Sequence, residues 1–179
     1  MKKTILLTAV LLLAAGTAFA QHGHGNCGNC PHHRHQQAQQ QSTAPVPIGP
    51  TFEQAAAQAF PAMLSTKKEG KWTAVYDSQK KLLGYLVNSK PASNGIKGYA
   101  GETPVMIAFN VKKRITGVYL LANQETPKFV KHVEQTGYFN NWNGLSVKKA
   151  LKKKVDTVSG ATFTSRAVAE SVRAVLATL

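Results

Sequence analysis

The feature that most constrains the fold is a repeated pattern of two short apolar runs joined by a polar turn. The runs cover residues 72–76, 82–87, 104–111 and 115–121. Runs of this length, rich in β-branched and aromatic residues and separated by a few polar residues, are typical of antiparallel hairpins. The sequence therefore predicts a small antiparallel sheet built from two hairpins.

Helical periodicity surrounds the hairpins. Apolar residues recur at helical spacing over three segments, which are 52–63, 127–137 and 165–179. Pro61 predicts that the first helix is short or kinked. Thr126, followed by Pro127, predicts an N-cap for the second. Together these elements predict a single compact α+β domain over residues 51–179, a length that suits one modest core.

The first 20 residues have the form of a secretory signal. Two lysines precede an apolar run from Ile5 to Ala15, and Ala18-Phe19-Ala20 has the small-x-small form of a cleavage site. The run is shorter than the about 20 apolar residues that a membrane-spanning helix needs. We expect cleavage after Ala20 and export to the periplasm or the outer side of the cytoplasmic membrane. An uncleaved N-terminal anchor is the alternative.

Residues 21–50 differ in composition from the rest of the chain. This segment holds six glutamines, five histidines and four prolines and almost nothing that can form a core, so it predicts a disordered tail and a Pro-containing linker. Imidazole and thiolate groups suit Zn or Cu, whereas two Cys residues in an exported chain also suit a disulfide. The tail therefore supplies weak metal candidates, which are His22, His24, Cys27, Cys30, His32, His33 and His35.

The positive charge of the chain bears on its partners rather than on its fold. The formal net charge is +14 at neutral pH, which favours anionic partners. For an exported protein we expect membrane or soluble redox partners of acidic character, or an anionic membrane surface, and no nucleic acid. Five lysines lie close together, at positions 148, 149, 152, 153 and 154. We interpret that stretch as solvated surface rather than a docking patch.

A flexible turn and a hydroxyl precede the third helix. In Ser159-Gly160-Ala161-Thr162 the glycine permits a tight bend, and an apolar helix follows. The N-terminus of a helix offers unpaired N–H groups and positive dipole density, which favour a phosphate or another anion. Taken alone, the pattern also fits a simple N-cap, and Thr164 stands where such a cap is expected.

A longer pattern around this turn resembles the flavinylation motif of the FMN-binding domain family. It consists of Asp156, two residues, Ser159 to Thr162, Thr164-Ser165 and the helix that follows. The family includes FMN-carrying subunits of the sodium-pumping NADH:quinone reductase and of Rnf-type ion pumps. In it the last Thr of the Ser-Gly-Ala-Thr element carries FMN through a phosphoester bond. A separate flavin transferase, with FAD as donor, installs that bond. The resemblance implies that Thr162 is the attachment residue, with Asp156, Ser159, Gly160 and Ala161 around it.

Two further elements, in the family's order, extend the resemblance over roughly residues 72–179. Gly98-Tyr99 lies in a glycine-rich loop before the second hairpin, and Glu125-Thr126-Pro127 follows that hairpin. Asn123 and Lys128 depart from the His and Gly that are common in the family. The resemblance implies that Glu125 and Thr126 line the flavin site, and that the loop with Gly98 and Tyr99 lies against the flavin ring. From spacing alone, a plain connection is an equal interpretation of that loop.

The function that these elements predict is electron transfer by an extracytoplasmic flavoprotein with covalent FMN, rather than catalysis by a stand-alone enzyme. His132 is the one His after residue 50, and a lone His on a helix is more often structural. The aromatic stretch from Tyr138 to Gly144 either frames a flavin or enters the core, and core is the commoner fate. Two alternatives stay open: an exported metal-binding protein that uses the His/Cys-rich tail, and a domain that binds FMN without a covalent bond.

Overall fold

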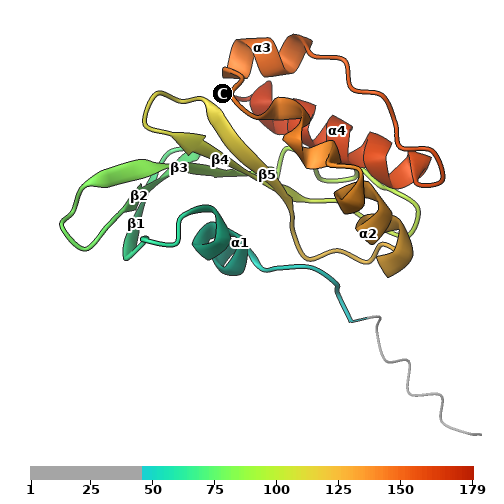
Figure 1. The fold of residues 1–179 in the computed structure, drawn as a ribbon, viewed down its shortest axis with the longest axis horizontal. Helices are drawn as coiled ribbons and strands as arrows, with labels where there is room; N and C mark the ends of the chain where they lie inside the picture. The colour runs from blue at the N-terminus through green and yellow to red at the C-terminus, as the bar shows by residue number, and fades with distance from the viewer. Residues whose placement is uncertain (1–45) are drawn as a thin grey trace, which may run out of the picture. The chain divides into compact units, whose positions relative to one another are not determined.

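The computed structural model describes residues 46–179, which form one α+β unit (Figure 1). The predicted signal and the tail as far as residue 45, with its seven weak metal candidates, lie outside the described residues. The sheet has five antiparallel strands in the order β1-β2-β3-β4-β5. The strands are β1 (Ser65–Glu69), β2 (Trp72–Tyr76), β3 (Leu82–Asn88), β4 (Val105–Asn110) and β5 (Ile115–Leu120). The predicted α+β fold with an antiparallel sheet is confirmed.

Both predicted hairpins are present, and the same turn chemistry closes each of them. The Asp77 carboxylate accepts hydrogen bonds from the amides of Gln79 and Lys81, at 2.8 and 2.9 Å. In the second hairpin the Asn110 side chain accepts from the amides of Lys112 and Arg114, at 2.9 and 3.0 Å. Asp and Asn favour turns because their side chains bond the backbone two residues on.

The edge strand β1 has no counterpart in the sequence prediction. Its five residues, Ser-Thr-Lys-Lys-Glu, are all exposed, so no apolar alternation signals a strand. It nevertheless pairs with β2 along its whole length, from Ser65 opposite Tyr76 to Glu69 opposite Trp72. Charged side chains on an edge strand oppose pairing with a second chain.

Helices cover both faces of the sheet (Figure 1). α1 (Phe52–Ala59) packs on one face, and α2 (Pro127–Gln135), the 3-10 helix η1 (Tyr138–Trp142), α3 (Val147–Lys152) and α4 (Thr162–Leu176) lie on the other. The strand β4, which lies between β3 and β5, is buried on both faces, because Ile107 and Phe109 enter the core under α4 while Met106 contacts the α1 side. A strand buried on both faces reads as a continuous apolar run.

The helical elements agree with the periodicity except at the start of α4. α1 ends at Ala59, before Pro61, and α2 begins with Pro127 at its first position after Thr126. Tyr138 and Trp142 are buried, which confirms the core interpretation of the aromatic stretch. The five lysines at 148, 149, 152, 153 and 154 are exposed, on and after the unpredicted helix α3, as expected of solvated surface.

Backbone pairing with the rest of the domain begins at Ile48. Ile48 and Asn123 form an antiparallel bridge, and the Ala122 amide donates to the Pro50 carbonyl at 2.8 Å. The Asn123 side-chain amide adds hydrogen bonds to the carbonyls of Ile48 and Leu121, at 3.2 and 2.8 Å. These contacts start slightly ahead of the boundary predicted at residue 51. Within residues 46–179, no helix combines the length and the apolar character needed to cross a membrane.

Candidate cofactor-binding site

The turn before α4 brings the Thr162 hydroxyl to the beginning of a helix. Gly160 has φ of 79°, a left-handed conformation that residues with a Cβ rarely adopt. Ala161, which is buried, is the N-cap residue, and Thr162 is the first helical residue. Thr162 is partly exposed, and its Oγ1 donates one long hydrogen bond, 3.4 Å, to the Val158 carbonyl. The hydroxyl is therefore partly accessible and held by one weak hydrogen bond.

The N-terminus of α4 has no side-chain cap and no acidic residue in its first turn. The helix is 15 residues long, so its aligned peptide dipoles concentrate positive potential at this end. The first backbone N–H groups of a helix have no intrahelical acceptor. Such an end suits a phosphate group.

Ser165 and Tyr138 hold the turn from the inside. The Ser165 hydroxyl donates to the Ala161 carbonyl at 2.9 Å and accepts from the Val158 amide at 3.0 Å. The Tyr138 hydroxyl donates to the Ser165 carbonyl at 2.8 Å. Burial, with a smaller contribution from the charge of Asp156, raises the pKa of Tyr138 to about 12. Tyr138 therefore stays a hydrogen-bond donor at neutral pH, while Asp156 itself is exposed.

Thr164 is not the helix cap that its sequence position predicts. It is the third residue of α4, only 1% exposed, and its hydroxyl donates to Oε2 of Glu125. The prediction was wrong because α4 begins at Thr162 rather than after Ser165. The first turn of α4 is polar at most positions, so the apolar period gives no sign of it.

Glu125 joins the loop that precedes β4 to the first turn of α4. Its side chain is 2% exposed. The carboxylate accepts a hydrogen bond from the Thr164 hydroxyl and three more from consecutive amides, those of Tyr99, Ala100 and Gly101, at 3.1, 2.7 and 3.0 Å. Three elements that are far apart in the sequence, and that the resemblance placed in one site, therefore meet at this carboxylate.

The hydrogen bonds to Glu125 keep its carboxyl group ionised. Burial acts to raise the pKa of the Glu125 carboxyl, because a low-dielectric environment disfavours the charged form. The hydrogen bonds from Thr164 and from the three loop amides stabilise the carboxylate and together outweigh burial, so the pKa lies below its ordinary value. At neutral pH the loop is therefore bound to a negative charge.

Gly98 and Thr126 occupy supporting positions beside Glu125. A Cβ on Gly98 would lie 2.8 Å from the carboxylate atoms of Glu125, so the close approach of the loop requires glycine. Thr126 is the N-cap residue of α2, although its side chain makes no cap hydrogen bond. Among residues 46–179, no three His, Cys, Asp or Glu side chains gather as a metal site.

Two aromatic side chains beside these elements are exposed. Tyr99 is 66% exposed and Phe163 is 62% exposed, although aromatic rings usually bury most of their area. The Tyr99 ring packs edge-on against Phe129 of α2, with 5.6 Å between ring centroids. Phe163 was not among the predicted site residues. Its signal in the sequence is an aromatic residue directly after Thr162 that lies off the apolar stripe of α4.

His132 lies against the glycine turn. Its Nε2 is 3.0 Å from the Ser159 carbonyl oxygen. Because a carbonyl oxygen only accepts, Nε2 is the donor in this contact. A Cβ on Gly160 would stand 3.9 Å from the same nitrogen. His132 thus links α2 to the turn, a contact that local sequence patterns do not indicate because 27 residues separate the partners.

Comparison with known proteins finds a family match for part of the chain. Residues 98–177 match the model of the FMN-binding domain. A subunit of the Na(+)-translocating ferredoxin:NAD(+) oxidoreductase complex from Acetobacterium woodii is 29% identical over 106 residues, covering 53% of this chain and 48% of that protein. The chain thus spans about half the length of this curated relative.

Among solved structures, the crystal structure of NqrC from Shewanella oneidensis aligns with a TM-score of 0.41 and 19% identity, covering 72% of this chain and 75% of that one. The segment matched by the family model contains all the predicted elements, from Gly98 through Glu125 to Thr162. Residues 98–177 therefore match the FMN-binding domain family, the family that the sequence motifs resemble.

Proposed function

We propose that this domain carries FMN covalently, through a phosphoester bond to Thr162, and transfers electrons outside the cytoplasm. The observation that supports the proposal most strongly is the position of Thr162. It is partly exposed, it follows a left-handed glycine turn, and it begins a 15-residue helix whose N-terminus has no side-chain cap. The family match supplies the identity of the cofactor.

The groups around Thr162 fit the phosphate of FMN. A phosphodiester at Thr162 keeps one negative charge next to the unpaired amides of α4, and no residue of the first helical turn is itself acidic. The carboxylate that contacts this turn, that of Glu125, is buried and already accepts four hydrogen bonds. A helix N-terminus stabilises such a charge by about 0.3–1 kcal/mol at an exposed position. The side chain of Ala161 is buried in the core, so it does not occupy this approach.

The two exposed aromatic residues fit the ring system. Tyr99 and Phe163 belong to the two elements that Glu125 ties together, the loop and α4. Aromatic faces suit the isoalloxazine ring because stacked or edge-on contacts between rings are favourable. When bound, FMN accepts and gives electrons, and the protein supplies position and environment. The role of Glu125 is then to hold Tyr99 at the site.

A separate flavin transferase supplies the attachment step in this proposal. A threonine hydroxyl is a weak nucleophile at neutral pH, and the hydrogen-bond partner of Thr162 is the carbonyl of Val158, which is not a base. With FAD as donor, the new bond joins Oγ1 of Thr162 to the phosphorus of the FMN half, and AMP leaves. We expect the transferase to recognise Asp156, which is exposed.

Location and partners form the remaining part of the proposal. The signal-type N-terminus supports export, and covalent attachment would retain FMN where no cofactor pool replaces it. The relative from Acetobacterium woodii is named as a subunit of an oxidoreductase complex, which supports membrane or soluble redox partners for this chain. The net charge of +14 favours partners of acidic character.

Peptide mass mapping tests the proposal. The full chain, expressed in an exporting host that has the transferase, should stay yellow after denaturation and carry the FMN mass on the fragment that contains Thr162. Thr162→Ala should lose the adduct and remain folded. Thr164→Ser is the matched control, because it keeps the hydroxyl that binds Glu125, and it should keep the adduct.

Three other outcomes would count against covalent attachment at Thr162. An FMN adduct that persists in Thr162→Ala would contradict the assignment of the residue. Flavin released by denaturation of the wild type would favour a domain that binds FMN without a covalent bond. A colourless protein with stoichiometric metal by elemental analysis would favour the metal-binding alternative.

A further inference from the structure

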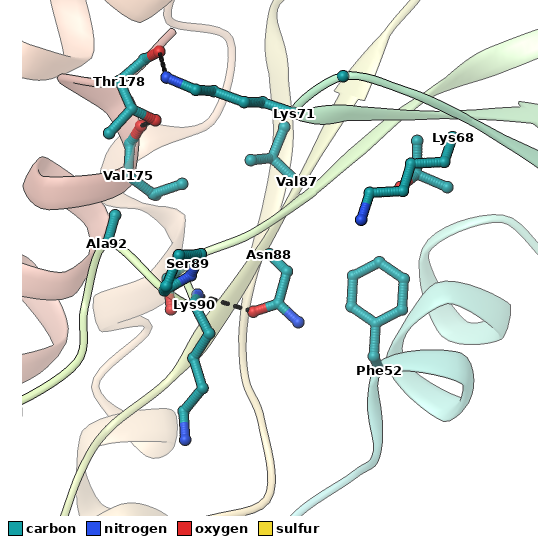
Figure 2. A pocket seen from close by; sticks show the side chains of 13 residues that line it. Phe52, Lys68, Lys71, Val87, Asn88, Ser89, Lys90, Ala92, Val175 and Thr178 are labelled. Atoms are coloured by element: carbon teal, nitrogen blue, oxygen red, sulfur yellow. Dashed lines mark hydrogen bonds between the residues drawn. The ribbon is translucent and has the colours of Figure 1, made fainter.

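A pocket of about 600 Å³ lies at the opposite end of α4 from Thr162. Its walls are the β1–β2 hairpin, the end of β3 with the loop after it, the first residue of α1 and the last turn of α4 (Figure 2). Val175 on its wall stands 13 positions after Thr162, or about 20 Å along the helix axis at 1.5 Å per residue. The pocket is therefore distinct from the candidate FMN site, and its volume is in the range of small-molecule sites.

The inner surface of the pocket combines apolar walls with positive charge. Phe52 and Lys68 stand on one side, and Ala92 and Val175 face them from the other (Figure 2). The charged lining residues are all lysines, at positions 68, 71 and 90. No Asp or Glu belongs to the lining set. This combination favours a ligand with an apolar body and an anionic group.

The three lysines differ in how far their charges are already compensated. Lys90 pairs with Glu102 at 3.0 Å. The Lys71 ammonium donates to the Thr178 carbonyl at 2.6 Å, which leaves two of its three N–H donors for a ligand. Lys68 forms no ion pair with any residue from 46 to 179. Two positive charges at the pocket, those of Lys68 and Lys71, therefore lack a carboxylate partner.

The apolar walls belong to the folded core, so they are rigid. Val87 and Val175, both buried, are members of the main core cluster. Ser89 beside them is fully buried and hydrogen-bonded to Ser93. Lys68 and Lys71 are exposed at the mouth. A ligand would thus place its apolar body against a fixed wall while its anionic group reached the two ammonium groups.

We propose that this pocket binds a small amphipathic anion, with an aromatic or aliphatic body and one carboxylate, phosphate or sulfonate group. Lys68 and Lys71 bind the anionic group by charge-assisted hydrogen bonds, which are about twice as strong as neutral ones. Phe52, Val87 and Val175 contact the body. The inference is independent of the proposed function, because none of these residues lies at the Thr162 end of α4.

Calorimetric titration of the full chain with naphthalene-2-sulfonate tests the proposal. We expect one saturable site with an affinity at least about tenfold above that for inorganic phosphate, which lacks the body, or 2-naphthol, which lacks the charge. The double variant Lys68→Gln/Lys71→Gln should weaken binding by about tenfold. Lys148→Gln/Lys149→Gln removes the same charge from exposed positions on α3, and its affinity should stay within about twofold of the wild type.

Several results would overturn the proposal. One is the absence of saturable binding, and another is an equal loss of affinity in the α3 control pair. If inorganic phosphate bound as tightly as the sulfonate, the apolar walls would contribute nothing, and the site would be only a cluster of positive charges. Capture by phosphatidylglycerol vesicles that depends on Lys68 and Lys71, without binding of the soluble sulfonate, would assign the two lysines to a membrane surface instead. Because both lysines are exposed, melting curves should confirm that the variants fold.

Discussion

Replacing Glu125 by Gln tests whether one carboxylate holds the loop of residues 98–101 against α4. In the wild type Oε1 accepts from the amides of Ala100 and Gly101, and Oε2 accepts from the Tyr99 amide and the Thr164 hydroxyl. Glutamine has nearly the same shape but only one oxygen. If that oxygen faces Ala100 and Gly101, the new NH₂ group faces Tyr99 and Thr164.

The expected cost follows from this exchange of partners. The Thr164 hydroxyl can rotate and accept from the new NH₂ group, but the Tyr99 amide is a donor and loses its acceptor. An orphaned, partly buried donor costs about 1 kcal/mol, and the change of the other hydrogen bonds from charged to neutral acceptors costs roughly another 1 kcal/mol. We therefore expect Glu125→Gln to lower the free energy of unfolding by about 2 kcal/mol.

Thr164→Val and Thr164→Ser provide the matched series. Valine keeps the volume but removes one of the four donors, so the cost should be about 1 kcal/mol. Serine keeps the hydroxyl, and it loses only a methyl group. In urea melts the order of stability should be wild type, then Thr164→Ser, then Thr164→Val, then Glu125→Gln. Native-state hydrogen exchange at Tyr99, Ala100 and Gly101 should accelerate most in Glu125→Gln.

The effect of Glu125→Gln should also depend on pH. The pKa of the Glu125 carboxyl lies below its ordinary value in the fold. Its contribution to stability is therefore complete above the unfolded-state pKa of about 4.3 and is lost as pH falls through the folded-state pKa. The difference between wild type and Glu125→Gln should shrink below about pH 4. A cost under about 0.5 kcal/mol, or a cost that is the same in acid as at neutral pH, would refute the reasoning.

Other elements of the site give predictions that melting experiments check. Tyr138→Phe should cost about 1 kcal/mol at neutral pH. The pKa of Tyr138 is raised to about 12 in the fold. The wild type should therefore lose its stability advantage over Tyr138→Phe between roughly pH 10 and 12, as the unfolded chain deprotonates. A stability difference that stays constant over this pH range would contradict the burial of the hydroxyl. Gly160→Ala forces a Cβ into a left-handed turn and should cost about 1–2 kcal/mol, whereas an unchanged melt would mean that the turn relaxes. A chain that starts at Val46 should melt like the full chain, and one that starts at Thr51 should be about 1 kcal/mol less stable, because it lacks the Ile48–Asn123 bridge; equal stability would show that the bridge contributes nothing.

The sequence predicted correctly those elements that neighbouring residues specify, such as an apolar run that ends at a polar turn. The two hairpins were correct because apolar runs end at turns that Asp77 and Asn110 close by themselves. The start of α4 was misplaced because its first turn, Thr-Phe-Thr-Ser, carries no apolar period. β1 was missed for the same reason, since all its side chains face solvent.

The contacts that assemble the candidate site could not be predicted from the sequence, because they join residues that are far apart along the chain. Glu125 lies 26 positions from Tyr99 and 39 from Thr164, and no periodicity relates residues so far apart. Motif resemblance placed Glu125 and Gly98 in one site, but it did not indicate that Gly98 is needed to make room for that carboxylate. Resemblance thus supplied candidate residues, and only the fold shows which of them contact one another.

The hydrogen bonds that begin at Ile48 run on toward α4. The Asn123 side chain donates to the Ile48 carbonyl and accepts from the Glu125 amide at 2.9 Å. A linker fused ahead of residue 46 therefore joins the domain on the side where Asn123 and Glu125 link it to the first turn of α4. A linker fused after Leu179 leaves from the other end of α4, which is about 20 Å long. With FMN on Thr162 as proposed, N-terminal tethering to a gold electrode should turn the flavin toward the gold surface, and C-terminal tethering should turn it toward solution. The two orientations should then differ in their rates of interfacial electron exchange.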